Sequence, residues 1–402
     1  MSESAPKKTS GFNVGRILSL RDVRWFELDW HVLAIALLLL GLGLVFVHAM
    51  SEADRQFDRN EIDFGSHMKK VLMALPAFFV GLSVRPRWLR RNAYVVYGVC
   101  GFLLLALFFV GTSHNGSQRW IRIPLIDFEL QPSELAKVGV ILALARTLYR
   151  NRLQRLKDWG PPLALALVPM GLVAIQPDLG TAMTLVPVTL GMLYLAGARA
   201  KVIGAFVFGT ALVGFLVWQL QIGVHDYQLQ RIETWTHGFA AHDLIEAKSG
   251  PAFHTYHARV AIGNGSVLGQ GIGQGVANQT AYLPERDCDS IFAVIAEEAG
   301  WLGSTIVLFV YTLWIALIMG SAATLRDRFS RLAVGGIALY FAAHVFINVG
   351  VNLGLMPLTG LTLPLFSTGG SSMLTTFAVL GLALGLCAHH EPTLDEDSFR
   401  SY

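Results

Sequence analysis

Residues 290–321 read SIFAVIAEEAGWLGSTIVLFVYTLWIALIMGS, an apolar run that is long enough to cross a lipid bilayer as one helix. Five carboxylates stand just before this run or inside its first part: Glu285, Asp287, Asp289, Glu297 and Glu298. Acidic groups at the edge of a bilayer, or buried in it, are costly and usually functional. The apolar run therefore indicates a membrane protein, and the acidic residues at its start indicate a candidate functional site.

Apolar runs of this kind recur along the whole chain. Of its 402 residues, 53% are hydrophobic and only 15% are charged, a composition that excludes an ordinary soluble enzyme. We predict an all-α polytopic membrane protein with about ten transmembrane helices. The candidate spans are residues 31–50, 68–84, 93–111, 133–149, 161–176, 179–197, 202–222, 290–321, 332–355 and 371–388.

The two ends of the chain differ from this apolar region. Residues 1–30 are polar and basic and lack the features of a cleaved signal peptide, so the first span is expected to be retained. Residues 389–402 form an acidic tail, and residues 31–388 are predicted to form one transmembrane domain. The three cysteines are odd in number, and two of them fall in apolar runs, so no disulfide framework is expected.

Lysines and arginines cluster in alternate connections between the spans. The clusters are Arg21 and Arg24; Arg85, Arg87, Arg90 and Arg91; Arg150, Arg152, Arg155 and Lys157; Arg199 and Lys201; and Arg326, Arg328 and Arg331. Because loops rich in these residues stay in the cytoplasm, both termini are predicted to be cytoplasmic. The outer face then carries residues 112–132, 176–181, 223–289 and 356–370.

The long outer segment 223–289 joins the seventh and eighth spans. Its aromatic residues, such as Trp235 and Tyr256, favour the membrane interface, so we expect short interfacial or re-entrant helices there. Non-helical backbone at membrane depth is tolerated only where protein or a watery cavity surrounds it, which implies a cleft. The sequence has no visible internal repeat, so an inverted-repeat transporter gains no support.

The first outer loop holds Arg119 beside Trp120 in the segment NGSQRW. An arginine next to an aromatic ring can pair a phosphate with a platform for a sugar or lipid. The alternative is an interfacial anchor, because Arg and Trp commonly flank membrane helices. Both residues are kept as candidates for substrate binding.

The segment QPSELAK, which follows this loop, reads as a helix start. Ser133 is expected to be the N-cap, and Glu134 lies in the first turn, where the helix dipole favours an acid. Lys137 lies three residues later and can pair with Glu134. A lysine that faces a membrane interior needs a partner or an anionic ligand, so both charged residues are candidates for substrate binding.

Three further outer segments are rich in turn residues and hydroxyls. In QPDLGT, Asp178 is either the N-cap of the next helix or a direct ligand. The glycine-rich residues 259–279 lack the Lys-Ser/Thr of a P-loop, and they either nest an anion such as pyrophosphate or provide flexible packing. At the last helix start, Ser367, Thr368 and Ser371 suit an anionic or sugar ligand.

Asp289 is the strongest candidate for a catalytic group. It immediately precedes the apolar run 290–321, so one role for it is the N-cap of that helix. Desolvation and repulsion by Glu285 and Asp287 both favour its uptake of a proton, which suits a general base. Cys288 lies between two acids and is expected to be a poor nucleophile.

Taken together, six segments resemble the SEDS family, the RodA and FtsW cell-wall polymerases of bacteria. They are NGSQRW, QPSELAK, QPDLGT, AIGNGSVLGQG, YLPERDCDSIFAVIAEE and GLTLPLFSTGGSS, in the order and spacing of the family. The resemblance covers nearly the whole chain. QPDLGT and GSQRWI favour the RodA branch, whereas GLTLPL also suits the division paralogue FtsW.

The resemblance implies a glycosyltransferase of the cytoplasmic (inner) membrane that polymerises lipid II at its outer face during cell elongation. Asp289 falls on the catalytic aspartate and would be the base for the acceptor 4-hydroxyl, with undecaprenyl pyrophosphate as leaving group. Arg119, Lys137 and Arg259 are candidates to stabilise the pyrophosphate, and Trp120 would shape the cleft. The implied partners are a class B penicillin-binding transpeptidase and other elongation-complex membrane proteins; no nucleic acid is expected.

The chain departs from the family beside the catalytic aspartate, where the usual His-Thr-Asp is Asp287-Cys288-Asp289. A divalent cation, Mg²⁺ or Mn²⁺, would offset the extra negative charge, and it is the one cofactor that the sequence suggests. The departure keeps a non-catalytic scaffold for a transpeptidase as an alternative. A second alternative is a lipid II flippase, whose polar path would use Glu297, Glu298, His344 and Asn348.

Overall fold

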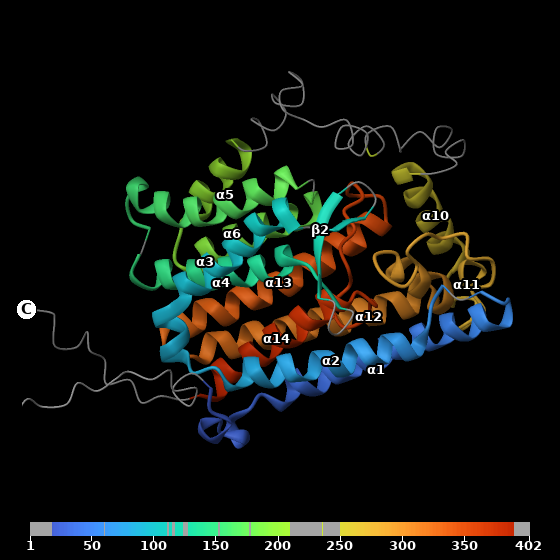
Figure 1. Cartoon of the computed structure of the whole chain (residues 1–402), viewed down its shortest axis with the longest axis horizontal. Helices are drawn as coiled ribbons and strands as arrows, with labels where there is room; N and C mark the ends of the chain where they lie inside the picture. The colour runs from blue at the N-terminus through green and yellow to red at the C-terminus, as the bar shows by residue number, and fades with distance from the viewer. Residues whose placement is uncertain are drawn as a thin grey trace, which may run out of the picture.

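The computed structural model of the chain describes residues 18–59, 61–110, 112–114, 117–123, 128–151, 153–176, 178–209, 235 and 250–389. These residues form a bundle of long helices with one small sheet (Figure 1). Most of the predicted seventh span, the first part of the long outer segment apart from Trp235, and most of both predicted tails lie outside the described residues.

The helices follow the predicted spans closely. They are α1 (Trp30–Gln56), α2 (Phe64–Ser83), α3 (Pro86–Val110), α4 (Pro132–Arg150), α5 (Gly160–Ile175), α6 (Leu179–Leu195), α10 (Gly250–Asn264), α11 (Val276–Thr280), α12 (Ile291–Thr324), α13 (Arg328–Asn352) and α14 (Gly370–Ala388), with short 3-10 turns at Leu20–Asp22, Trp25–Glu27 and Leu156–Trp159. The seventh span is helical over Ala200–Gly209, where its described part ends.

Six helices of the described part are long and apolar enough to cross a membrane. They are Trp30–Gln56, Pro86–Phe109, Lys157–Ile175, Ile291–Thr324, Arg328–Asn352 and Gly370–Ala388. With the shorter apolar helices between them, they confirm the prediction of a polytopic, mainly α-helical membrane protein. The helices α10 and α11 also confirm that the second half of the long outer segment contains short helices.

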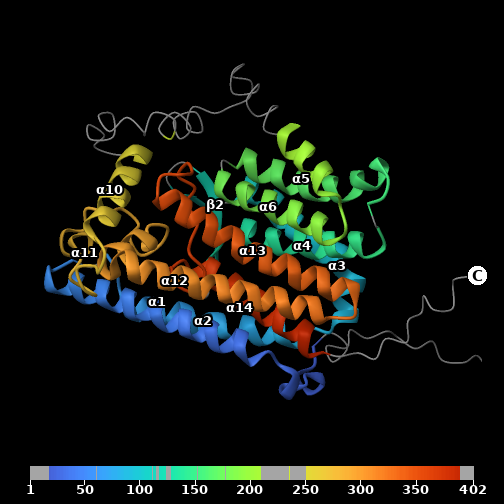
Figure 2. The same cartoon turned by 180° about the vertical axis from the view of Figure 1, so that it is seen from behind.

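The bundle has inner and outer helices. Helices α12, α13 and α14 lie between the pair α1 and α2 and the group α3 to α6, as both views show (Figures 1 and 2). The most apolar windows of α13 and α14 are 83% and 78% buried, against 33% for α1, which indicates that α1 leaves a lipid-facing side. Helices α10 and α11 lie together at one end of the bundle.

Glycines allow α2 and α14 to touch along their backbones. A Cβ atom at Gly381 would lie 2.0 Å from the carbonyl oxygen of Phe78, and one at Gly385 would lie 2.5 Å from that of Leu82. In a lipid bilayer no hydrophobic effect drives helices together. Small residues at such crossings instead let the helices approach closely and pack by van der Waals contact. This close contact fixes the position of α14 along α2, and with it the position of Ser371 in the first turn of α14.

The first outer loop contains a small antiparallel sheet, which the prediction of a plain loop missed. Its strands are β1 (Thr112–His114), β2 (Ser117–Ile123) and β3 (Phe128–Leu130), paired in the order β1-β2-β3. The β-branched and aromatic residues of SQRWIRI favour an extended backbone. The ring of Phe128 lies 3.3 Å from the position of a Cβ atom at Gly370, so the sheet packs against the start of α14.

Helix α12 is kinked at Gly300, whose backbone angles (φ 69°, ψ −172°) are not helical. The kink removes the helical hydrogen bonds of the preceding carbonyl groups, and the glycine-rich loop replaces them. The amide groups of Gln270 and Gly271 donate to the carbonyl oxygens of Glu297 (3.1 Å) and Glu298 (3.0 Å). These contacts support the packing interpretation of the glycine-rich loop over the anion-nest interpretation.

The side chains of Glu297 and Glu298 are buried and also bind this region. Glu297 Oε2 accepts a hydrogen bond from the amide of Ala277 (2.8 Å), and Oε1 accepts one from Asn264 Nδ2 (3.1 Å). Glu298 accepts a hydrogen bond from the side chain of Asn278. The two glutamates that a flippase path would use are therefore bonded to the loop and to α11.

We expect Gly300→Ala to destabilise the protein strongly. A Cβ atom there would lie 2.2 Å from the amide nitrogen of Gly269, and backbone atoms cannot move aside as a flexible side chain can. The positive φ alone would cost a non-glycine residue about 1–3 kcal/mol. The melting temperature of the purified protein in detergent measures the loss. Gly263→Ala is the matched control, because nothing lies within 4 Å of its Cβ position, and a melting temperature equally lowered in both variants would contradict the argument.

Candidate active site

The acidic segment before α12 folds as a tight turn. Glu285 has a left-handed backbone (φ 47°), and its carbonyl oxygen accepts hydrogen bonds from the amides of Cys288 (3.0 Å) and Ser290 (3.1 Å). The residue at the N-cap of α12 is Ser290, so the alternative role of Asp289 as the N-cap is wrong. The carboxylate of Asp289 is thus not used to begin the helix.

The backbone of Asp289 is fixed from α13. Asn348 and Asn352 are four residues apart and therefore lie on one face of that helix. Their Nδ2 atoms both donate to the carbonyl oxygen of Asp289, each at 2.9 Å. Both asparagines are buried, so these hydrogen bonds hold the start of α12 against α13 without using the Asp289 side chain.

Two other segments face the Asp289 carboxylate. His254, on α10, has its Nε2 atom 3.5 Å from Asp289 Oδ1 and 3.1 Å from Ser290 Oγ. On the other side, a Cβ atom at Gly360 would lie 3.8 Å from Asp289 Oδ2. Gly360 belongs to the connection between α13 and α14 and has a φ of 69°, which favours glycine. Three segments far apart in the sequence therefore meet at this aspartate.

The connection before α14 binds the acidic segment through hydroxyl groups that were predicted to suit an anionic or sugar ligand. Ser367 Oγ donates to the carbonyl oxygen of Cys288 (2.5 Å) and accepts from the amide of Leu363 (2.8 Å). Thr368 Oγ1 donates to the carboxylate of Asp287, and its carbonyl oxygen accepts from Lys70 Nζ of α2 (3.2 Å). These bonds hold the acidic turn in place; a direct role of Ser367 in substrate binding stays a prediction.

Burial and neighbouring acids alter the proton affinity of this turn. The Glu285 side chain is exposed at one side, but desolvation by the surrounding residues, followed by the charges of Asp289 and Asp287, raises its pKa above the usual range. Burial and the neighbouring Asp287 raise the pKa of the Cys288 thiol, so Cys288 stays protonated at neutral pH, as expected. Ligand atoms of Glu285, Asp287 and Cys288 lie within 4.8 Å of one another. Mg²⁺ and Mn²⁺ prefer oxygen ligands, so the carboxylates and not the thiol would hold such an ion.

We expect Glu285→Gln to stabilise the protein at neutral pH. A carboxyl whose pKa is raised by folding ionises first in the unfolded chain, so stability falls as pH rises from the ordinary value of 4.5 through the raised pKa. Because glutamine does not ionise, the variant does not lose this stability as pH rises. Melting temperatures should therefore favour the variant at neutral pH and converge with wild type below the ordinary pKa. An unchanged difference at both pH values would contradict the assignment.

A second group of candidates joins α4, α6 and α14. Asp178 is the N-cap of α6, as one of its two predicted roles required, with Oδ1 accepting from the amide of Thr181 (3.2 Å). Its Oδ2 accepts from Ser133 Oγ (3.0 Å) and Gln131 Nε2 (3.2 Å). Ser371 Oγ accepts from the amide of Gln131 (2.9 Å). A direct ligand role for Asp178 or Ser371 stays a prediction.

The predicted N-cap of α4 was wrong by two residues. The N-cap is Gln131, and Pro132 occupies the first helical position, where its missing amide proton costs nothing. Ser133 is therefore inside the helix, and its hydroxyl is available to Asp178 instead of the helix start. A long-range partner thus decides the role of this hydroxyl.

The third group is a buried charge network between α4 and α13. Lys137 Nζ lies 2.7 Å from Glu134 Oε1, which confirms the predicted pair, and 2.8 Å from Nε2 of His344. Tyr340 Oη donates to Glu134 Oε2 (3.3 Å). Lys137 is only 1% exposed, so the partner that a membrane-embedded lysine needs comes from the protein itself. Its binding of substrate stays a prediction.

The remaining predicted cations lie on separate elements. Arg119 and Trp120 are half-buried on β2 of the small sheet. Arg259 is exposed on α10, and its Cδ atom lies 3.1 Å from the position of a Cβ atom at Gly354 after α13. The structure thus brings Glu285, Ser367 and Asp289 into one turn-centred cluster, while the other candidates lie in the elements around it.

Sequence reasoning missed a buried arginine in the acidic turn. Arg286 is 3% exposed, and its guanidinium is paired with the carboxylate of Asp54 at the end of α1, which is 0% exposed. Two features of the sequence could have indicated this pair. Arg286 lies between the acids Glu285 and Asp287, and an acidic residue near the end of an apolar helix, such as Asp54, needs a partner. What the sequence lacked was any indication that α1 reaches this turn.

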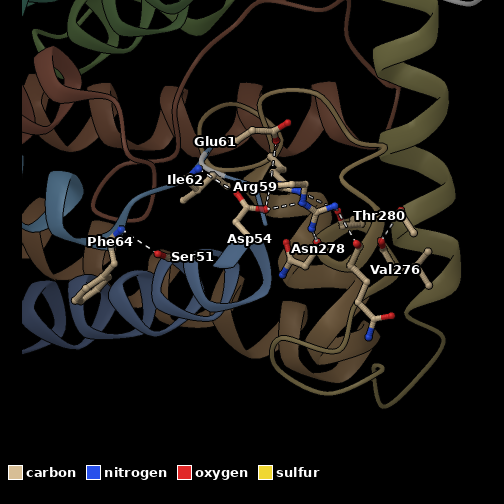
Figure 3. Close-up of polar contacts among 12 residues, drawn as sticks. Ser51, Asp54, Arg59, Glu61, Ile62, Phe64, Val276, Asn278 and Thr280 are labelled. Carbon is tan, nitrogen blue, oxygen red and sulfur yellow. Dashed lines mark hydrogen bonds and ion pairs between the residues drawn. The ribbon is translucent and has the colours of Figure 1, made fainter. Parts of the chain in front are cut away.

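Asp54 is the centre of a wider polar cluster (Figure 3). Its Oδ1 also binds Arg59 Nε (3.1 Å), and its Oδ2 accepts from the amide of Ile62 (3.0 Å). Arg59 donates further to the carbonyl oxygens of Asn278 (2.6 Å) and Gln279 (2.9 Å) on α11. The cluster therefore ties α1, the α1–α2 connection, α11 and the acidic turn into one unit.

Comparisons with known proteins agree over almost the whole chain. The FtsW/RodA/SpoVE family profile, described as "Cell cycle protein", matches residues 29–391. The peptidoglycan glycosyltransferase MrdB of Escherichia coli strain K12 is 33% identical over 369 residues, which cover 91% of this chain and 95% of MrdB. The probable peptidoglycan glycosyltransferase FtsW of Alkalilimnicola ehrlichii is 36% identical over 370 residues, or 90% of this chain and 89% of that protein.

Solved structures with the same arrangement of helices are also known. A chain of the structure described as "Structural coordination of polymerization and crosslinking by a peptidoglycan synthase complex" matches with a TM-score of 0.75 and 30% identity, covering 90% of this chain and 98% of that one. The rod shape determining protein RodA of Thermus thermophilus matches with a TM-score of 0.67 and 27% identity, covering 91% and 99%.

Proposed function

The chain belongs to the FtsW/RodA/SpoVE (SEDS) family of peptidoglycan glycosyltransferases, and from that membership we propose that it polymerises lipid II into glycan strands with Asp289 as the general base. In this reaction the 4-hydroxyl of the incoming lipid II attacks the anomeric carbon of the growing chain. Asp289 takes the hydroxyl proton, undecaprenyl pyrophosphate leaves, and the α-linked donor becomes a β-linked product.

The observation that carries this proposal is the placement of Asp289. Two buried asparagines bind its backbone carbonyl group, and its carboxylate does not cap α12. A general base must be held within reach of the proton that it takes, and a rigid helix junction provides such a position. The carboxylate also lies beside a second polar side chain, because His254 Nε2 is 3.5 Å from Asp289 Oδ1.

The leaving pyrophosphate needs positive charge or N–H groups as its own charge grows. We propose Arg119, Arg259 and Lys137 for this role, with Trp120 shaping the acceptor side. Arg259 is exposed and Arg119 is half-buried, whereas Lys137 is only 1% exposed, so the two arginines are the more accessible candidates. Because leaving-group stabilisation acts mainly in the transition state, loss of either arginine should lower kcat more than it raises KM.

We further propose the cellular setting. Residues 31–388 form the transmembrane domain, the tails 1–30 and 389–402 are cytoplasmic, and the active site faces outward from the inner membrane, as the positions of Lys and Arg indicate. The RodA-like motifs favour a role in cell elongation. A class B penicillin-binding transpeptidase is the proposed partner, since a similar chain occurs in a complex that couples polymerization and crosslinking.

The deciding experiment is lipid II polymerisation by the purified protein, with and without the transpeptidase, and with Mg²⁺, Mn²⁺ or a chelator. Glycan strands from wild type would support the proposal, and their loss in the chelator would support the predicted cation. The absence of strands under all these conditions from a well-folded protein would instead favour the non-catalytic scaffold, with the Asp287-Cys288 pair as the cause.

A further inference from the structure

His254 lies against the proposed base from a different part of the chain. It is on α10, is 8% exposed, and places Nε2 3.5 Å from Asp289 Oδ1. We infer that His254 is a positioning residue for Asp289: it holds Oδ1 and leaves Oδ2 to take the proton of the acceptor hydroxyl. This inference rests on the proposed function, because it takes Asp289 to be the base.

The two oxygen atoms of the carboxylate have different surroundings. Oδ1 is buried and accepts no hydrogen bond within the described part of the chain, so the imidazole of His254 is the polar group that it faces. Oδ2 faces Gly360, where a Cβ atom would lie 3.8 Å away. A larger side chain at this position would occupy the space in front of Oδ2, and the left-handed backbone there also favours glycine.

Ser290 fixes the imidazole in turn. Its Oγ atom lies 3.1 Å from the same Nε2 atom, and Ser290 is 0% exposed at the N-cap of α12. A proton on Nε2 therefore faces both the hydroxyl of Ser290 and the carboxylate of Asp289. Because the surroundings are largely dry, the attraction between imidazole and carboxylate is stronger than it would be in water.

Charged and titratable groups face His254 from the acidic turn and from its own helix. Glu285 and Asp289 on the acidic turn attract an imidazolium, and His257, one turn later on α10, opposes it. The imidazole of His254 therefore lies where it can orient the Asp289 carboxylate. His254 thus acts through Asp289 and does not itself contact the acceptor in this scheme.

The test compares His254→Phe and His254→Gln with wild type in lipid II polymerisation. His254→Phe should lower kcat by about tenfold or more with little change in KM, because it removes an interaction needed for the reaction and not for binding. His254→Gln, whose amide group is polar and can donate a hydrogen bond to Oδ1, should recover part of the rate. A lower kcat at a nearly unchanged KM, with partial rescue by glutamine, is a pattern that a purely structural role would not produce.

His257→Gln is the matched control on the same helix. Its ring packs against the rings of Phe253 (4.1 Å between centroids) and Tyr282 (5.0 Å) and not against the carboxylate, so kcat and KM should stay as in wild type. Wild-type kcat in both His254 variants, with Asp289→Asn inactive, would overturn this inference alone. Full activity of Asp289→Asn would overturn the proposed base as well. If His254→Phe does not fold, the kcat and KM of His254→Gln decide: a lowered kcat at wild-type KM supports the inference, and wild-type values overturn it.

Discussion

Replacing Asp289 by Asn should nearly abolish glycan synthesis in a protein that still folds. Asparagine has the same shape but cannot take a proton, and loss of a general base typically costs about a hundred- to ten-thousand-fold in rate. The fold should survive, because Asn348 and Asn352 bind the backbone carbonyl of residue 289 and not its side chain. The initial rate of lipid II polymerisation at saturating substrate measures the effect.

The matched control is the same substitution at another helix start. Asp63 is the N-cap of α2 and accepts hydrogen bonds from the amides of Gly65 (3.2 Å) and Ser66 (2.8 Å), and asparagine caps helices equally well. Asp63→Asn should therefore polymerise lipid II at the wild-type rate. If Asp289→Asn kept more than about a tenth of the activity, a loss far below that of a general base, the base would have to be another group.

The second large effect is expected from Asp54, which should be essential for stability. Asp54→Ala would leave the buried guanidinium of Arg286 without its main partner and would also remove a partner of Arg59. Breaking a buried ion pair by removing one member typically costs about 3–5 kcal/mol. Chemical or thermal unfolding in detergent should show this loss, and activity should fall with it, because Arg286 lies in the turn that carries Asp289.

A neighbouring acid provides the control. Glu61 Oε2 lies 3.2 Å from the same guanidinium, but its side chain is 63% exposed. Exposed ion pairs contribute about 0–1 kcal/mol, so Glu61→Gln should leave stability almost unchanged. The double variant Asp54→Leu/Arg286→Met should regain part of the loss, since it removes both charges together. Equal stability of Asp54→Ala and wild type would show that the cluster is not a structural anchor.

Short-range features of this protein were predictable from its residues. Nine candidate spans coincide with helices, because a helix in a membrane satisfies its own backbone and needs only a sufficient apolar length. The cap at Asp178 and the pair of Glu134 and Lys137 were also correct, since both interactions join residues three positions apart. The order of the motifs likewise predicted the family that the comparisons show.

Long-range features were not predictable in the same way. The small sheet around Arg119, the use of Ser133 by Asp178 and the attachment of the glycine-rich loop to α12 depend on contacts between distant segments. A hydroxyl or amide group near a helix start has several partners of similar strength, and the local sequence does not rank them. Packing decided each case by bringing one partner within reach.

The sequence by itself therefore determined the membrane class, the spans and the acidic turn with Asp289, because apolar length and local spacing act within a few residues. Only the tertiary structure decided what surrounds that aspartate. His254, the asparagines of α13 and the pair of Asp54 and Arg286 come from helices that meet only when the bundle is packed. Their proximity depends on which faces of the helices pack together, and a buried charge finds its partner through that packing and not through its place in the sequence.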